Sequence, residues 1–173
     1  MYKSVFCNKN ILITGHTGFK GFWLAIILKK LGAKVSGISL PKANDNESHF
    51  NILEGEKLFK NYYHDIRDYK FLEPIFREIK PDYIFHLAAQ AIVSESYERP
   101  LDTFTTNTIG SLNILEAARK TNDKCNIIMI TSDKVYENVE WIYGYRENDL
   151  LGGQDLYSAS KASAEIAIKS YFS

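Results

Sequence analysis

Four side chains with proton-transfer chemistry stand out in the sequence, and they occur as two pairs. Tyr157 and Lys161 are four positions apart, so on a helix they point the same way and the ammonium would favour the phenolate form of the tyrosine. A tyrosine activated in this way is a base near neutral pH. Asp133 and Lys134 supply an acid and an amine on a separate segment, which indicates a second proton-transfer step. The Tyr-x-x-x-Lys spacing alone is more often a surface pair, so its meaning depends on the rest of the chain.

A glycine-rich turn near the amino terminus gives that spacing its context. The apolar run 10–14 leads into Gly15-His-Thr-Gly18-Phe-Lys-Gly21 and then into the apolar segment 22–28. This order is typical of a dinucleotide fingerprint: Gly15 permits a tight turn, Gly18 lets N–H groups approach a pyrophosphate, and Gly21 lets helix and strand pack closely. The spacing is Gly-x-x-Gly-x-x-Gly rather than Gly-x-Gly-x-x-Gly, so glycines that serve only a turn and a packing contact are the alternative.

Length and composition indicate one globular domain. The chain has 173 residues, and its 21 basic side chains balance 21 acidic ones, so no net charge recruits nucleic acid or a membrane surface. The longest apolar run, residues 22–28, is far too short to span a bilayer. Cys7 and Cys125 form no disulfide framework, and a cytoplasmic location is expected. No metal site is expected, because ligand spacing is absent among the remaining candidates, His16, His49 and His64.

Strand-like and helix-like segments alternate along the chain. This predicts an α/β fold, a Rossmann-type doubly wound parallel sheet with helices on both faces. Strands are expected at 10–14, 34–39, 60–64, 82–87 and 126–131, and helices at 19–31, 68–79, 101–120 and 157–172. The glycine turn, His86–Gln90 and Thr131–Lys134 each follow a strand, so we expect them to meet in one crevice at the carboxyl ends of the strands. Residues 41–57 are expected to be a surface excursion, and 134–156 an aromatic insert.

Seven short motifs occur in the order found in the extended short-chain dehydrogenases/reductases. More narrowly, the chain resembles the CDP-glucose 4,6-dehydratases over essentially its whole length. The motifs are Thr14-Gly-His-Thr-Gly-Phe-Lys-Gly21, Asp65-Ile-Arg-Asp68, His86-Leu-Ala-Ala-Gln90, Asn107 in its Thr-Asn-Thr-Ile-Gly context, Thr131-Ser-Asp-Lys134, Gly144-Tyr-Arg-Glu-Asn-Asp149 and Tyr157-Ser-Ala-Ser-Lys161.

The resemblance implies conversion of CDP-glucose to CDP-4-keto-6-deoxyglucose, with a bound NAD that is reduced and then reoxidised. Tyr157, helped by Lys161, would take the proton of the sugar 4-hydroxyl. Water would then leave across C5 and C6, with Asp133 as the acid. Ser132 would bond the sugar 4-oxygen, and Lys134 serves as a base only if its pKa is depressed.

The resemblance also implies a set of cofactor contacts. Their residues are Gly15, Thr17, Gly18, Phe19, Asp65, Ile66, Ala88, Ala89, Asn107, Tyr157 and Lys161. Asp65 would contact the adenine, although a helix-capping acid would look the same. Asn107 would distort its helix and order a water, with an ordinary buried amide as the alternative, whereas His86 reads as a structural histidine. NAD is favoured over NADP because no arginine follows Ser39, although Lys42 could meet a 2′-phosphate.

Members of this family continue well beyond the tyrosine–lysine helix. The resemblance therefore implies that residues 1–173 are an incomplete NAD(P)-binding Rossmann-type domain without the carboxy-terminal region that grips the substrate nucleotide. The strand at 126–131 would then be an edge. The resemblance also implies a homodimer through helices 101–120 and 157–172. The alternatives are a nucleotide-sugar epimerase or reductase on the same scaffold, and a non-catalytic NAD-binding module.

Overall fold

A five-stranded parallel sheet forms the centre of the protein. The computed structural model describes residues 2–41, 47–121 and 124–172. The strands lie in the order β3-β2-β1-β4-β5 and all neighbouring pairs are parallel, which is the order of a Rossmann-type sheet with its reversal between β1 and β4. They are β1 (Asn10–Thr14), β2 (Lys34–Ser39), β3 (Lys60–Tyr63), β4 (Tyr83–His86) and β5 (Asn126–Met129). The expected edge position of the last strand is confirmed.

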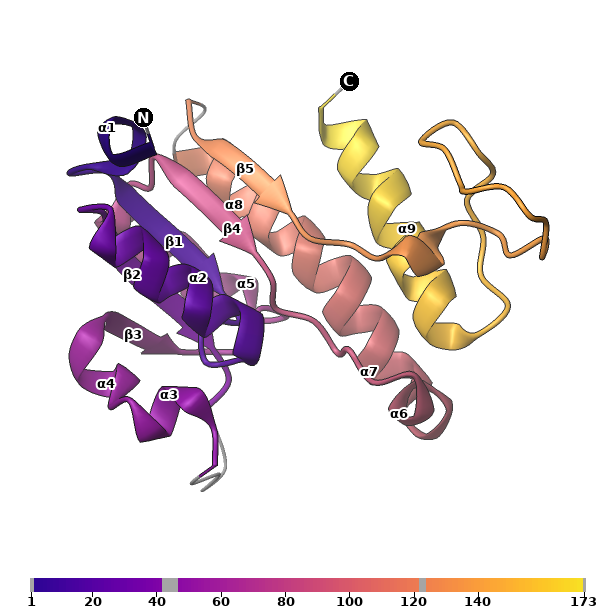
Figure 1. The fold of residues 1–173 in the computed structure, drawn as a ribbon, viewed down its shortest axis with the longest axis horizontal. Coiled ribbons are helices and arrows are strands. Elements are labelled where there is room, and N and C mark those ends of the chain that lie inside the picture. The colour runs from indigo at the N-terminus through magenta and orange to yellow at the C-terminus, as the bar shows by residue number, and fades with distance from the viewer. Residues whose placement is uncertain (1, 42–46, 122–123, 173) are drawn as a thin grey trace.

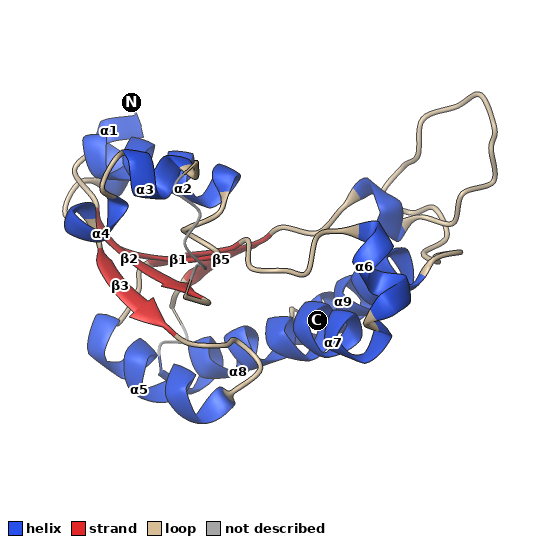
Figure 2. Ribbon diagram, turned by 90° about the horizontal axis from the view of Figure 1, so that it is seen from below, coloured by secondary structure: helices blue, strands red, loops and turns tan. Residues whose placement is uncertain are grey.

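Helices cover both faces of this sheet, as predicted. Figure 2 shows α1 (Tyr2–Phe6), α2 (Phe19–Lys30), α3 (His49–Ile52) and α4 (Gly55–Leu58) on one face, and α5 (Tyr69–Ile79) and α8 (Ser111–Thr121) on the other. Beyond the carboxyl ends of β4 and β5 lie α6 (Val93–Glu98), α7 (Pro100–Phe104) and α9 (Leu156–Tyr171) (Figure 1). In the described part of the chain, no helix is long and apolar enough to cross a membrane.

Strand β1 divides the hydrophobic core into two halves. Ile11 and Ile13 pack with Phe22 under α2, whereas Leu12 points the other way and packs with Phe76 of α5. All three strand residues are fully buried. Alternate side chains of a strand face opposite sides, so a continuous apolar run is what a central strand covered on both faces requires.

The ends of the helices are fixed by local chemistry. Gly32 follows α2 with a φ of +89°, and its N–H bonds the carbonyl of Lys29 while the N–H of Ala33 bonds the carbonyl of Leu28. This is a Schellman motif, and the left-handed residue in it favours glycine. At the start of α9, the side chain of Asp155 accepts a bond from the N–H of Ser158 and caps the helix that carries the tyrosine–lysine pair.

Residues 101–120 do not form one continuous α-helix, which corrects that prediction. A π-helical segment, η1 (Thr105–Gly110), separates α7 from α8 and contains Asn107, where a distortion was expected. The side chain of Ser111 donates to the carbonyl of Asn107 at 2.7 Å, and side-chain bonds of this kind compete with the regular helical pattern. Segments of π-helix are rare and occur often at functional sites.

The described part of residues 41–57 is more than a surface excursion. It forms α3 and α4, and Phe50 is only 4% exposed. The ring of Phe50 packs edge-on against that of Phe22, with the ring centroids 5.6 Å apart. Because the rest of the segment is polar, its composition did not indicate that Phe50 is part of the core. The insert at 134–156 stays largely exposed, with one bridge between Tyr136 and Leu151.

Candidate functional site

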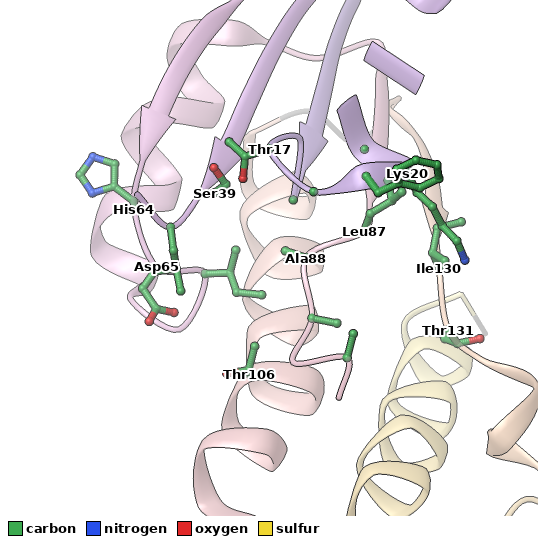
Figure 3. A pocket seen from close by; sticks show the side chains of 18 of the residues that line it. Thr17, Lys20, Ser39, His64, Asp65, Leu87, Ala88, Thr106, Ile130 and Thr131 are labelled. Carbon is green, nitrogen blue, oxygen red and sulfur yellow. The ribbon is translucent and has the colours of Figure 1, made fainter. Parts of the chain in front are cut away.

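A cavity of about 570 Å³ opens at the carboxyl ends of the strands (Figure 3). Its size is within the usual range for a small-molecule site. The glycine turn after β1, the ends of β2 and β3, the segment after β4 and the start of α9 all contribute. From the predicted set it gathers Gly15, Thr17, Gly18, Phe19, Asp65, Ile66, Ala88, Ala89, Tyr157 and Lys161. The glycine turn, residues 87–89 and Thr131 therefore meet there as the crevice argument predicts, whereas Ser132, Asp133 and Lys134 of the third predicted segment do not line the cavity.

The glycine turn is shaped by close backbone contacts. Gly15 has a φ of +74°, and a Cβ on it would lie 2.8 Å from the backbone nitrogen of Ala88. A Cβ on Gly21 would lie 2.2 Å from the carbonyl oxygen of Gly15. Gly18 precedes α2 without any side-chain cap, so the first N–H groups of this helix keep their donor capacity for a ligand.

Lys161 is a buried ammonium beside the cavity. It is 6% exposed, and Tyr157 is 9% exposed. Burial lowers the pKa of Lys161 to about 8, because removal from water disfavours the charged form. In the described residues no carboxylate forms an ion pair with it. Buried charges are normally paired, so this ammonium suits a phenolate or the hydroxyl groups of a ligand.

A buried relay of hydrogen bonds begins at His86. Its Nδ1 lies 2.7 Å from Oγ1 of Thr14, and its Nε2 lies 3.0 Å from Oγ of Ser111. Ser111 donates its only hydroxyl proton to the carbonyl of Asn107, so it must accept from Nε2–H. Oγ1 of Thr14 already accepts from the N–H groups of Leu87 and Ala88, so it donates its own proton to Nδ1, which is the acceptor. This assigns His86 as a neutral imidazole, in agreement with the structural role predicted for it.

The relay continues from Asn107 to the helix that carries Tyr157. The Asn107 amide donates to the carbonyl of Gln90 at 3.0 Å and to Oγ of Ser160 at 2.9 Å. Ser160 donates in turn to the carbonyl of Tyr157 at 2.7 Å. Asn107 is 1% exposed and does not line the cavity. The structure thus places it as a support for α9 and the segment after β4, apart from the other cofactor-contact candidates.

Asp65 and Ser39 lie at the end of the cavity formed by β2 and β3 (Figure 3). The acid that caps α5 is Asp68, whose side chain accepts from the N–H of Lys70, so the capping alternative for Asp65 is wrong. The hydroxyl of Ser39 is buried and has no hydrogen-bond partner among the residues that the structure describes. Lys42, the residue considered for a 2′-phosphate, falls outside the described part of the chain.

The predicted elimination residues follow β5 but do not line the cavity. Thr131 lines it, whereas Asp133 and Lys134 lie in the short 3₁₀ helix η2 (Asp133–Val135) and are exposed. Ser132 donates to Oδ1 of Asp133 at 3.1 Å. Nζ of Lys134 pairs with Oδ2 of Asp155 at 3.2 Å, which ties η2 to the start of α9. Among the described residues, no group of His, Cys, Asp or Glu could hold a metal ion.

Several lining residues carried no sequence signal of their own. They include Lys20, Leu40, Pro41, His64, Ala91, Thr106 and Ile130. Most lie in or next to a predicted motif, so including every residue of each motif and its immediate neighbours would have found them. Ser111 is different, because only the three-dimensional contact with His86 reveals its role.

Comparisons with known proteins identify the family of this chain. The sequence model of GDP-mannose 4,6 dehydratase matches residues 12–173. The chain belongs to this family. It is 41% identical over 169 residues to the CDP-glucose 4,6-dehydratase of Salmonella typhimurium, covering 98% of this chain and 47% of that protein. It is 32% identical to the dTDP-D-glucose 4,6-dehydratase of Dictyostelium discoideum, covering 95% of this chain and 40% of that protein.

Solved structures agree with this membership of the GDP-mannose 4,6-dehydratase family. The UDP-glucose 4-epimerase of Thermotoga maritima with UDP-glucose superposes with a TM-score of 0.79 at 31% identity, covering 94% of this chain and 50% of that one. The Thermus thermophilus UDP-glucose 4-epimerase in complex with NAD gives a TM-score of 0.79 at 29% identity, with 93% and 50% covered. The chain spans about half the length of the relatives it matches.

The assignment of His86 predicts an acid-sensitive fold. Burial, followed by the charge of Lys161, lowers the pKa of His86 to about 3 from 6.5. Below pH 6.5 the imidazole of His86 therefore binds a proton in the unfolded chain but stays neutral in the folded chain until the pH nears 3. The free energy of unfolding should be at its full value above pH 6.5 and fall by at most roughly 1.4 kcal/mol per pH unit on this account as the pH drops toward 3.

Nitrogen NMR of the imidazole ring tests the assignment directly. We expect the Nε2–H tautomer of His86 to persist between pH 5 and 8, and chemical denaturation at the same pH values measures the loss of stability. An imidazolium signal for His86 at about pH 6 would contradict the hydrogen-bond assignment.

Proposed function

We propose that this chain is the cofactor-binding part of a sugar-nucleotide 4,6-dehydratase that uses NAD and acts on CDP-glucose. The observation that carries the proposal is the single cavity in which the glycine turn meets Tyr157 and Lys161. The 41% identity to a CDP-glucose 4,6-dehydratase supports the choice of substrate. The product would be CDP-4-keto-6-deoxyglucose.

Three groups around the cavity suit a dinucleotide because each lacks a protein partner in the described structure. The N–H groups that begin α2 after Gly18 have no side-chain cap and suit a pyrophosphate. The buried hydroxyl of Ser39 has no hydrogen-bond partner and suits a ribose hydroxyl, which favours NAD over NADP. The ammonium of Lys161 has no carboxylate partner and suits hydroxyl groups beside Tyr157.

The chain's own residues would then move two sets of protons. When bound, the nicotinamide supplies the redox chemistry by accepting a hydride from C4 of the sugar and returning it to C6. Tyr157 takes the proton of the 4-hydroxyl as general base, and the buried ammonium of Lys161 lies one turn further along α9. Ser132 holds the sugar 4-oxygen. The 4-ketone that forms makes the C5 proton acidic.

Asp133 would protonate the departing 6-hydroxyl. Lys134 is the candidate base for C5, and its amine is engaged by Asp155 at 3.2 Å. Lys134 must leave this pair before its amine can reach a sugar bound in the cavity.

An epimerase or reductase is the second candidate, since solved epimerases share this fold. The Tyr157 and Lys161 pair would serve either reaction. Asp133 and Lys134 favour elimination, because an epimerase needs no acid and base for the loss of water. A non-catalytic NAD-binding module is the third candidate, and loss of water from CDP-glucose distinguishes the dehydratase from the other two.

Binding of NAD is predicted to depend on Gly18. A valine side chain there would fill the space next to the free N–H groups of α2, so Gly18→Val should weaken NAD binding by about a hundredfold or more, the effect of losing two or more charge-assisted hydrogen bonds. Gly144→Val is the control, since nothing lies within 4 Å of a Cβ on Gly144. Equal NAD affinity of wild type and Gly18→Val in calorimetry would refute this site.

The two proton-transfer steps are predicted to be separable in a protein that carries this chain at the full length of its relatives. Tyr157→Phe should stop cofactor reduction, whereas Asp133→Asn should allow reduction and slow the loss of water by about a hundredfold or more. Rapid-mixing absorbance of reduced nicotinamide follows the first step and mass spectrometry follows the second. Failure of Asp133→Asn to accumulate the 4-keto-glucose intermediate would remove Asp133 from the elimination step.

We further propose a homodimer through the α7–η1–α8 segment and α9. Leu101, Ile109 and Ile166 lie on these helices and are 79%, 47% and 56% exposed. Ile109→Lys should leave the protein monomeric in sedimentation velocity, because a lysine ammonium is poorly tolerated in an apolar interface. Leu150→Lys, on the exposed insert, should leave the dimer intact. A monomeric wild type would refute the proposal.

A further inference from the structure

Among the described residues, every hydrogen bond to the carboxylate of Asp65 comes from Arg67. Oδ1 accepts from the backbone N–H of Arg67 at 2.8 Å and from its Nε at 3.1 Å. Oδ2 accepts from Nε at 2.9 Å and from Nη2 at 2.6 Å. Asp65 lines the cavity, whereas Arg67 does not. The guanidinium therefore bonds the carboxylate from outside the cavity, on the side away from a bound ligand.

Arg67 is itself fixed from a second direction. Its Nη1 donates to Oδ1 of Asp102 at 2.9 Å, and Oδ2 of Asp102 accepts from Nε of Arg99 at 2.8 Å. The backbone is held independently, because Nδ2 of Asn113 donates to the carbonyls of Ile66 and Arg67, each at 3.0 Å. Main chain and side chain of this loop are thus both restrained before any ligand arrives.

This grip limits what the carboxylate can recognise. A carboxylate has about four acceptor positions, and Arg67 offers it three N–H protons, of which that of Nε is shared by both oxygens; three protons leave acceptor capacity for about one more donor. Arg67 also lowers the pKa of Asp65 by hydrogen bonding to the ionised form. An ionised carboxylate only accepts hydrogen bonds, so the open position suits an amino group and is repelled by a carbonyl oxygen.

We propose that Arg67 is a specificity-determining residue that acts through Asp65. By holding the carboxylate in one orientation with one open acceptor position, Arg67 makes the cavity select a purine with an exocyclic amino group over the same purine with a ring carbonyl. The inference rests on the proposed function, in which this cavity binds NAD and Asp65 meets the adenine. It adds a positioning residue outside the cavity, and it ties base selection to α7 through Asp102.

Calorimetry with NAD and with nicotinamide hypoxanthine dinucleotide tests the inference. The two ligands differ at C6, which carries an amino group in NAD and a carbonyl oxygen in the analogue, and at the adjoining N1, which carries a proton only in the analogue. The wild type should bind NAD more tightly by about tenfold or more, the effect of one hydrogen bond to a charged group. Arg67→Met should lose most of this preference, mainly by weaker binding of NAD. Arg77→Met is the matched control, because Arg77 pairs with Glu73 on the surface of α5 and should keep the full preference.

A second pair of variants separates positioning from folding. Arg67→Lys keeps the charge without the fork-shaped donor set, so its preference for NAD should be intermediate, and thermal unfolding reports whether each variant is folded. Asp65→Asn should abolish or reverse the preference. In that background Arg67→Met should change it no further, because Arg67 acts only through the carboxylate.

The outcomes are distinguishable. Retention of the wild-type preference by folded Arg67→Met, or tighter binding of NAD by it, overturns the role of Arg67 while leaving the proposed NAD site intact. A wild type that binds both dinucleotides equally overturns base selection at Asp65. A wild type that binds neither overturns the proposed function and this inference with it.

Discussion

The neutral imidazole of His86 is the constraint on which the rest of the site depends. It is fully buried and bonded on one side to Thr14 and on the other to Ser111. Thr14 also accepts from the N–H groups of Leu87 and Ala88, so the ends of the two central strands are held at one point. Each hydroxyl in the relay has a single proton and therefore a defined direction. Replacing one member leaves a buried polar group unpaired, which costs far more than the bond itself contributes.

That relay explains how the sheet positions the glycine turn and Tyr157 around one cavity. The glycine turn directly follows Thr14, and the support for Tyr157 begins at Asn107, which accepts from the hydroxyl of Ser111. The glycine turn and α9 are therefore linked through hydrogen bonds rather than through apolar packing alone. Directional bonds fix orientation more narrowly than dispersion contacts do, and the proton transfer that we propose for Tyr157 would need that accuracy.

The sequence predicted those parts of the fold that local rules control. Apolar runs without alternation predicted the central strands, and Gly32 marked the end of α2 because only a left-handed residue closes that turn. The sequence did not reveal the burial of Phe50, because its neighbours in the chain are polar. It also did not reveal the extent of η1, where the local bond from Ser111 to Asn107 is joined by long-range bonds from Asn107 to Gln90 and Ser160. In the site, motif order predicted which segments converge. Motif order could not show that Arg67 bonds the carboxylate of Asp65, or that Asn107 lies outside the cavity lining, because both depend on the directions of side chains.

The π-helical segment η1 also constrains how many residues this part of the chain can contain. Successive residues of an α-helix are turned by about 100°, and η1 (Thr105–Gly110) places Asn107 and Ser111 one after the other on the relay. Deleting one residue from η1 would let α7 and α8 join as a regular α-helix. The number of apolar side chains on the joined helix could stay the same. The deletion would also swing Ser111 by about a quarter of a turn relative to Asn107, away from His86. This stretch should therefore tolerate changes of side chain far better than insertions or deletions, even though it lies in a helix rather than in the sheet.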